Sequence, residues 1–249
     1  MSFLPIVDRE LRIRSRRPTT YRMRWMLVGS VLLIWFLLLA NSHHSMSPAQ
    51  RGQMLFAVVG IIAFVFSLLS GAFVTADCLS HEKREGTLGL LFLTNLRGYD
   101  VVLGKLIAYS LHAFFGLLAI LPLLSLPLLI GGVSVAQFWR VTLSLITTML
   151  VSLSFGMIVS AFTRDTRTSL GSTLLGLFAL TGCPYLLWAF GRFSGLHWPD
   201  YFLYLSPAYL YAEAYDNYRG MGYRLSDFSI SLQALLSLIG LFLFGAAAS

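Results

Sequence analysis

Six stretches of the chain are apolar on every side and long enough to cross a bilayer as helices. A helix needs about 20 residues to span the hydrocarbon, and hydropathy identifies six such segments. They are residues 23–40, 53–76, 101–130, 138–162, 168–190 and 229–248. They lack the alternation with a period of two that a membrane β-barrel strand shows. The pattern predicts an all-α, polytopic membrane protein with six transmembrane helices.

The composition supports a membrane location. Hydrophobic residues make up 57% of the 249 residues and charged residues only 12%, whereas soluble domains carry about 25% charged residues. The formal net charge of +7 could indicate nucleic-acid binding in a soluble protein. Here the basic residues flank the apolar segments instead. We therefore expect the lipid bilayer, and no nucleic acid, as a partner.

The positions of lysine and arginine predict the orientation. Thirteen of the 18 basic residues precede or enter segments 23–40, 101–130 and 168–190. Because short cytoplasmic loops are enriched in these residues, we expect these ends to face the cytoplasm. After six spans both termini would then be cytoplasmic. The arginine-rich start lacks the pattern of a cleavable signal peptide. The expected location is a bacterial-type plasma (inner) membrane.

Two segments are predicted to lie at the membrane surface. Residues 1–22 mix apolar side chains with arginines, which favours an N-terminal interfacial amphipathic helix over a solvated basic tail. Residues 191–228 form an outer loop rich in aromatic side chains, which prefer the interface. Within it, Ser206 followed by Pro207 is typical of a helix N-terminus. We expect a short outer helix, either resting on the surface or forming a lid over a translocation path.

Proline and hydroxyl residues interrupt the apolar segments. Pro122 and Pro127 each remove a backbone hydrogen bond, which predicts either a bent third helix or one that ends early and turns at Gly131-Gly132; Pro184 is interpreted in the same way. The hydroxyl residues of the fourth and fifth segments are expected to pack helices together rather than line a path. They are Ser144, Thr147, Thr148, Ser152, Ser154, Ser160, Ser169, Ser172 and Thr173.

A charged stretch, residues 77–100, separates the second and third apolar segments. Residues 82–85 are too polar for hydrocarbon. Thr87 is suited to cap a short helix whose N-terminal dipole favours Glu85, and Gly98 is suited to end it. The leucines of this helix have nothing within the loop to bury them. The helix is therefore either a docking surface for a partner or a stiffening element on the membrane surface.

This stretch resembles the ABC-2 type transporter permease family. The resemblance is carried by Glu82-Lys83-Arg84-Glu85-Gly86-Thr87-Leu88-Gly89-Leu90-Leu91, followed by Asp100-Val101-Val102-Leu103-Gly104-Lys105-Leu106. In that family a glutamate-rich segment leads into Gly-Thr-Leu, a leucine-rich helix and a Gly-Lys pair that enters the third span. The likeness extends over most of the chain, so residues 1–249 would form a single ABC-2 type transmembrane domain.

The resemblance implies partners and a site. Family members pair as two permease subunits, identical or different, on two cytoplasmic ABC ATPase subunits. Their loop between the second and third spans contains a coupling helix that docks into the ATPase. By resemblance, the ATPase interface here comprises Glu82, Glu85, Gly86, Thr87, Leu88, Leu91 and Phe92. Gly89 departs from the larger or acidic residue expected in many relatives.

Other chemistry is not indicated. The run from Gly98 to Gly104-Lys105 resembles a phosphate-binding loop, but its spacing is one residue too long and Leu106 replaces the required Ser or Thr. His43-His44 with Met46 could bind copper in principle, although a short polar loop is the simpler interpretation. We predict no catalytic, cofactor-binding or metal-binding residues and no enzymatic activity.

The residues and the resemblance together predict the permease subunit of an ABC-2 type exporter, powered by ATP hydrolysed in a separate subunit. One alternative is a non-transporting membrane anchor or assembly factor that recruits a cytoplasmic partner through the same loop. A second alternative is a membrane-embedded enzyme. It would need ionisable residues inside the spans, and these segments contain almost none.

Overall fold

The computed structural model describes residues 29, 32, 33, 36, 47–75, 98–163, 165–194, 200–215 and 225–248. The elements in these residues are all helical. They are α3 (Pro48–Thr75), α6 (Gly98–Ile130), α7 (Val135–Phe162), α8 (Thr166–Ser194), the 3-10 helix η1 (Asp200–Leu205), α9 (Pro207–Tyr215) and α10 (Leu225–Ala248).

The second to sixth predicted spans are confirmed as helices. In the described part of the chain, α3, α6, α7, α8 and α10 are each long and apolar enough to cross a membrane. Of the first predicted span, residues 23–40, only Gly29, Leu32, Leu33 and Phe36 are described, and these four are helical. The predicted interfacial helix, residues 1–22, lies outside the described residues.

Local capping explains why α3 begins before its apolar run. The amide of Gln50 donates to Ser47 Oγ at 3.3 Å, and the amide of Ser47 donates to Gln50 Oε1 at 3.1 Å. These reciprocal bonds form a capping box, and Pro48 occupies the first helical position, where no amide donor is needed. The helix therefore starts five residues before the hydropathy boundary at residue 53.

The third predicted span is one continuous helix rather than one that ends early. Helix α6 continues past Pro122 and Pro127 and ends at Ile130. Gly131 and Gly132 then adopt φ values of 101° and 90°, a region that side chains disfavour and glycine tolerates. This tight turn leads to Ser134, whose Oγ accepts from the amide of Gln137 at 3.1 Å and caps α7.

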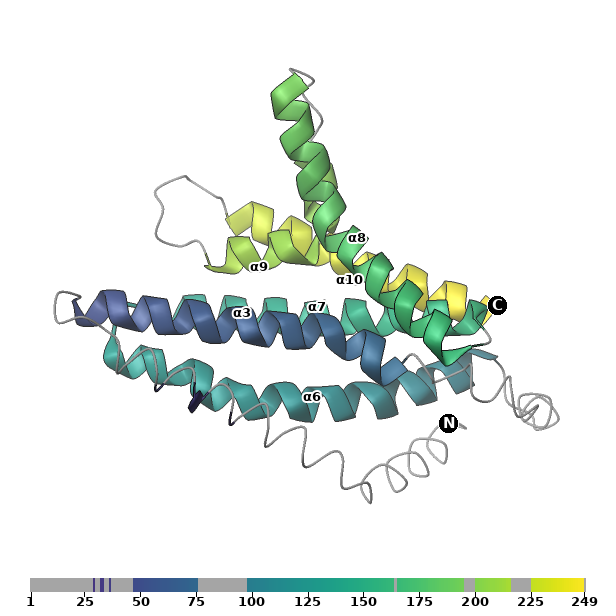
Figure 1. The fold of residues 1–249 in the computed structure, drawn as a ribbon, viewed down its shortest axis with the longest axis horizontal. Coiled ribbons are helices and arrows are strands. Elements are labelled where there is room, and N and C mark those ends of the chain that lie inside the picture. The colour runs from purple at the N-terminus through teal and green to yellow at the C-terminus, as the bar shows by residue number, and fades with distance from the viewer. Residues whose placement is uncertain are drawn as a thin grey trace.

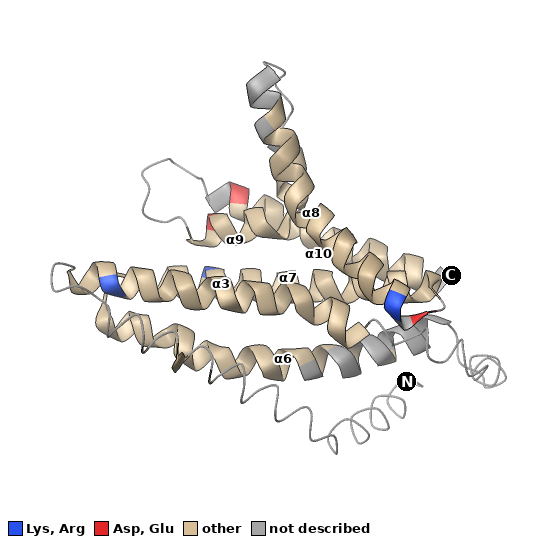
Figure 2. Ribbon diagram, viewed as in Figure 1, with Lys and Arg blue, Asp and Glu red and all other residues tan. Residues whose placement is uncertain are grey.

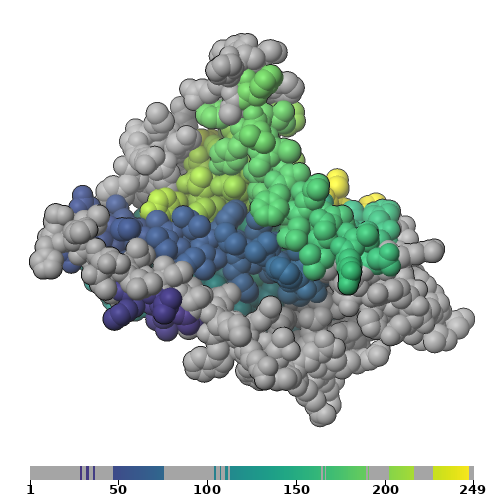
Figure 3. Space-filling model, in the orientation of Figure 1, coloured from purple at the N-terminus to yellow at the C-terminus, as the bar shows by residue number. Residues whose placement is uncertain are grey.

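Helix α7 is the central element of the bundle. It packs against α3, α6, α8, α9 and α10, and α3, α6 and α7 lie side by side over most of their length (Figure 1). In the apolar part of α7, 67% of the residues are buried, against 17% in α8 and 11% in α10. Figure 3 shows α3 and α8 forming much of the described surface on one face.

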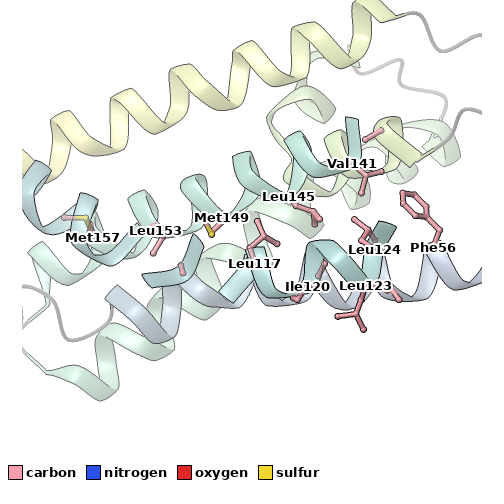
Figure 4. Packing of buried hydrophobic residues seen from close by; sticks show 14 of the residues in the cluster. Phe56, Leu117, Ile120, Leu123, Leu124, Val141, Leu145, Met149, Leu153 and Met157 are labelled. Carbon is pink, nitrogen blue, oxygen red and sulfur yellow. The ribbon is translucent and has the colours of Figure 1, made fainter. Parts of the chain in front are cut away.

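The core lies between α3, α6 and α7 (Figure 4). Helix α7 contributes a stripe with a spacing of four residues, which places its members on one side of the helix. The fully buried members of the core include Phe56 from α3, Leu117, Ile120 and Leu124 from α6, and Leu145, Met149, Leu153 and Met157 from α7.

Candidate functional site

The predicted ATPase interface lies outside the described residues. It comprises Glu82, Glu85, Gly86, Thr87, Leu88, Leu91 and Phe92. The chain enters this segment from Thr75, the end of α3, and leaves it at Gly98, the start of α6. Residues 98–100, predicted to belong to the loop, form the first turn of α6.

The described helix ends nevertheless fall into two groups. The C-termini of α3, α7 and α10 and the N-termini of α6 and α8 lie at one end of the bundle, hereafter the loop end (Figure 1). The opposite end, hereafter the α9 end, holds the α6–α7 turn and α9. Charged residues with described side chains lie near one or other end (Figure 2). This arrangement matches the predicted alternation of spans.

The predicted helix start at Ser206-Pro207 is confirmed. Helix α9 begins at Pro207, and the Ser206 carbonyl accepts from the amides of Tyr209 and Leu210 at 3.1 and 3.2 Å. Ser206 is fully buried. Its hydroxyl donates to the carbonyl of Thr181 on α8 at 3.0 Å. The start of α9 is thus attached to α8.

The other end of α9 is attached to α3 and α7 through Tyr215. The Tyr215 hydroxyl donates to the Gln53 carbonyl at 3.2 Å, and Gln137 Nε2 donates to the Tyr215 carbonyl at 2.8 Å. The Tyr215 ring stacks on Phe56, with centroids 6.0 Å apart and 14° between planes. Helix α9 is therefore packed into the bundle, and its predicted placement, on the membrane surface or as a lid, stays a prediction.

Tyr211 forms a third contact between α9 and α3. Its ring centroid lies 4.9 Å from that of Phe64, and its hydroxyl lies so close to Gly60 that a Cβ at that position would overlap it. The hydroxyl is buried and makes no hydrogen bond in the structure. Burial raises the pKa of Tyr211 above its ordinary value.

Aromatic and acidic side chains gather where η1, α9 and α10 meet. The Tyr204 hydroxyl donates to Asp227 Oδ1 at 3.5 Å, and the Tyr204 and Tyr209 rings meet edge to face at 5.6 Å. Burial, followed by the charge and hydrogen bond of Glu213, raises the pKa of Tyr209. The described residues contain no group of three or more potential metal ligands. The cluster connects η1 to α10 through the Tyr204–Asp227 bond and η1 to α9 through the Tyr204–Tyr209 ring contact.

Polar groups also connect α3 to α7. Ser152 Oγ donates to the Leu68 carbonyl and accepts from the Gly71 amide, the latter at 2.9 Å. A Cβ at Gly71 would overlap Ser152, and one at Gly156 would overlap Thr75 Oγ1. These small residues let the two backbones approach closely.

The expected packing role of the hydroxyl residues is confirmed for Ser152. Ser152 links α7 to α3, whereas several others donate to carbonyls of their own helix one turn earlier. These are Ser144, Thr147, Ser154, Ser172 and Thr173. The glycines in close contact with other elements, such as Gly60 and Gly71 of α3, were not singled out from the sequence. Their signal was a spacing of 11 residues, which is close to three helical turns.

A family model described as "ABC-2 family transporter protein" matches residues 40–249. The chain belongs to the ABC-2 transporter family. The match includes the five described candidate spans, α9 and the segment between α3 and α6. A search of curated proteins finds no match to the chain. Membership and the long apolar helices together support an integral membrane transport permease, a class of transmembrane subunit that is generally non-catalytic.

Proposed function

We propose that this ABC-2 family chain is the permease subunit of an exporter driven by a separate cytoplasmic ABC ATPase. The observation that carries the proposal is the family match over residues 40–249. The helical bundle with its five described candidate spans supports it. A second permease subunit, identical or different, would complete the path through the membrane.

The proposed coupling runs through the segment between α3 and α6. Docking of Glu82, Glu85 and Leu91 on the ATPase, with Gly86, Thr87, Leu88 and Phe92 beside them, would apply force to the loop end of both helices. Each of these helices packs against α7. Because packed helices move as units, closure of the ATPases would change how α3 and α6 sit on α7. The loop and both termini would lie in the cytoplasm in this arrangement.

Helix α9 would close the α9 end of the path in the resting state. Its contacts with α3, α7 and α8 come from opposite ends of the helix. A helix held in this way blocks the space between its neighbours until those bonds break. This placement favours the predicted lid over a helix that only rests on the surface.

The first experiment separates transport from anchoring. The full chain, tagged and expressed in its native membrane, should copurify an ATPase whose ATP turnover changes when this subunit is present. An anchor or assembly factor would retain a partner whose ATP turnover is indifferent to it. A partner without ATP-binding motifs would contradict the proposal.

The second experiment tests the docking residues. Leu91→Asp and Glu85→Arg should each lower ATPase association and transport at least tenfold while leaving the subunit in the membrane. The first substitution places a charge in the interface, and the second reverses a charge there. Thr94→Asp, a similar change in the same loop, is the matched control. Unchanged association and transport in both variants would refute the docking role.

The third experiment tests orientation. A single cysteine at Thr94 in a background with Cys78 and Cys183 replaced should react with an impermeant thiol reagent only after the cells are opened. Efficient labelling in intact cells would overturn the cytoplasmic assignment of the loop.

A further inference from the structure

The bend of α8 and the start of α9 meet at one hydrogen bond. Helix α8 is continuous from Thr166 to Ser194 with Pro184 inside it, and its second half leaves the bundle (Figure 1). Pro184 has no amide hydrogen to donate to the Leu180 carbonyl, and its ring crowds that carbonyl. The next carbonyl, that of Thr181, accepts from Ser206 Oγ at 3.0 Å.

Three consecutive features weaken α8 at this point. Thr181 Oγ1 donates to the carbonyls of Leu177 and Phe178 at 2.9 and 3.2 Å, a pattern that bends helices. Gly182 adds backbone freedom, and a Cβ there would meet no atom within 4 Å. Pro184 follows two residues later. Sharp helix bends arise at such positions.

Packing changes at the same point. Before the bend, Leu177 is buried with Leu68 and Ala72 of α3, and Leu180 packs on the cluster of Val151, Leu210 and Leu235. After it, Leu186 is 70% and Phe190 66% exposed. The buried contacts of α8 with α3 and with the cluster around Val151 therefore come from the residues before the bend.

We infer that Ser206 is a positioning residue that seats α9 on the bend of α8, so that bending of α8 and release of α9 are one movement. Both partners lie out of contact with water, since Ser206 is fully buried and Thr181 is 9% exposed. Separation would leave the Ser206 hydroxyl buried without its acceptor, which is costly, so the bond couples a shift of one element to a shift of the other. This inference goes beyond the proposed function and concerns the chain itself, whether or not an ATPase partner is found.

The first arm of the test measures α8. Spin labels at Leu186→Cys and Leu143→Cys, both exposed positions, report the distance between the second half of α8 and α7. The full chain carries Cys78→Ser and Cys183→Ser, sits in lipid nanodiscs and is diluted with unlabelled chain. Ser206→Ala should shift or broaden the distance distribution by several ångströms. Ser144→Ala, which removes an equally buried hydroxyl bonded only within α7, should leave it unchanged.

The second arm measures α9. Pro184→Ala returns the missing donor to α8 and should straighten it, so hydrogen exchange in the peptide 207–215 should rise although no residue of α9 has changed. In this background Ser206→Ala should add little further change in either readout. Unaltered exchange in α9 after Pro184→Ala would overturn the inference, as would independent, additive effects of the two substitutions. The Pro184→Ala arm decides the matter even if Ser206→Ala fails to fold.

Discussion

Helices α7 and α8 are of nearly equal length and both apolar, yet they are held in different ways. Helix α7 contacts every other long described helix, and several of its hydroxyl groups bond across to α3 or back to its own carbonyls. Helix α8 is mostly exposed, and its second half extends from the bundle (Figure 1). Length and hydropathy alone therefore do not distinguish a helix buried at the centre of the bundle from one with few buried residues. The two helices differ in their contacts: α7 lies against Gly71 of α3 through Ser152, whereas α8 contains Pro184 in its interior.

The largest expected difference in unfolding free energy is between two glycine-to-alanine substitutions, one at the α3–α7 contact and one on α8. Gly71→Ala would place Cβ against the Ser152 backbone, so overpacking should cost at least about 1–3 kcal/mol of unfolding free energy. On α8, a Cβ at Gly171 would meet no atom within 4 Å, so Gly171→Ala should be neutral or stabilise by up to about 1 kcal/mol through helix propensity. Thermal unfolding in detergent measures both. Equal effects would remove the contrast.

The second prediction concerns the hydroxyl that links α7 to α3. Ser152→Ala removes the donor to Leu68 and the acceptor for the Gly71 amide, and should cost about 1–3 kcal/mol because both groups are buried. Ser154→Ala removes a hydroxyl that bonds only to Leu150 of its own helix and should cost less than half as much. Chemical denaturation of the two variants side by side is the measurement. A larger loss in Ser154→Ala would contradict the role of the α3–α7 link.

The third prediction compares two tyrosines of α9. Tyr215→Phe removes a hydrogen bond to Gln53 and should cost about 1 kcal/mol. Tyr211→Phe removes a buried hydroxyl that makes no hydrogen bond, so it should be neutral or slightly stabilising. The measurement is the melting temperature of each variant compared with that of the wild type. A clear loss in Tyr211→Phe would show that its hydroxyl has a hydrogen-bond partner in the folded protein.

The smallest expected effect appears only at high pH. The pKa of Tyr209 is raised above its ordinary value of 10.0 by burial and by Glu213. As pH rises, the Tyr209 hydroxyl therefore keeps its proton to a higher pH in the folded state than in the unfolded state. The stability contributed by this group is complete below pH 10 and is lost as pH rises further. Tyr209→Phe should show a shallower fall in melting temperature between about pH 9 and pH 11. If melting temperature falls with pH equally steeply in wild type and in Tyr209→Phe, the prediction is wrong.

The sequence was sufficient for the second to sixth spans and for the start of α9. Hydropathy placed several boundaries too far inside, because polar residues at the helix ends, such as Gln50 and Gln137, are helical although they are not apolar. The capping box at Ser47 would have corrected one of them. The coupling-helix residues stay a prediction.

The residues that contact Gly60 and Gly71 could not be predicted from the sequence, for a physical reason. A glycine in a span permits a neighbouring helix to approach closely, but the rotation and register of that other helix determine which residue it meets. Ser152 against Gly71 and Tyr211 against Gly60 are pairs of this kind. The same limit applies to Ser206, whose bond to Thr181 joins residues 25 positions apart.

The α6–α7 turn has a practical consequence for anyone who wishes to tag this protein. It is a short connection between two long helices, the sort of place where an epitope or fluorescent protein is commonly inserted. However, Gln53 Nε2 donates to the Gly132 carbonyl at 3.1 Å, and a Cβ at Gly132 would overlap the Ala49 backbone. An insertion there would push the first turn of α3 aside and separate three helices at once. Reporter cassettes belong elsewhere in the chain.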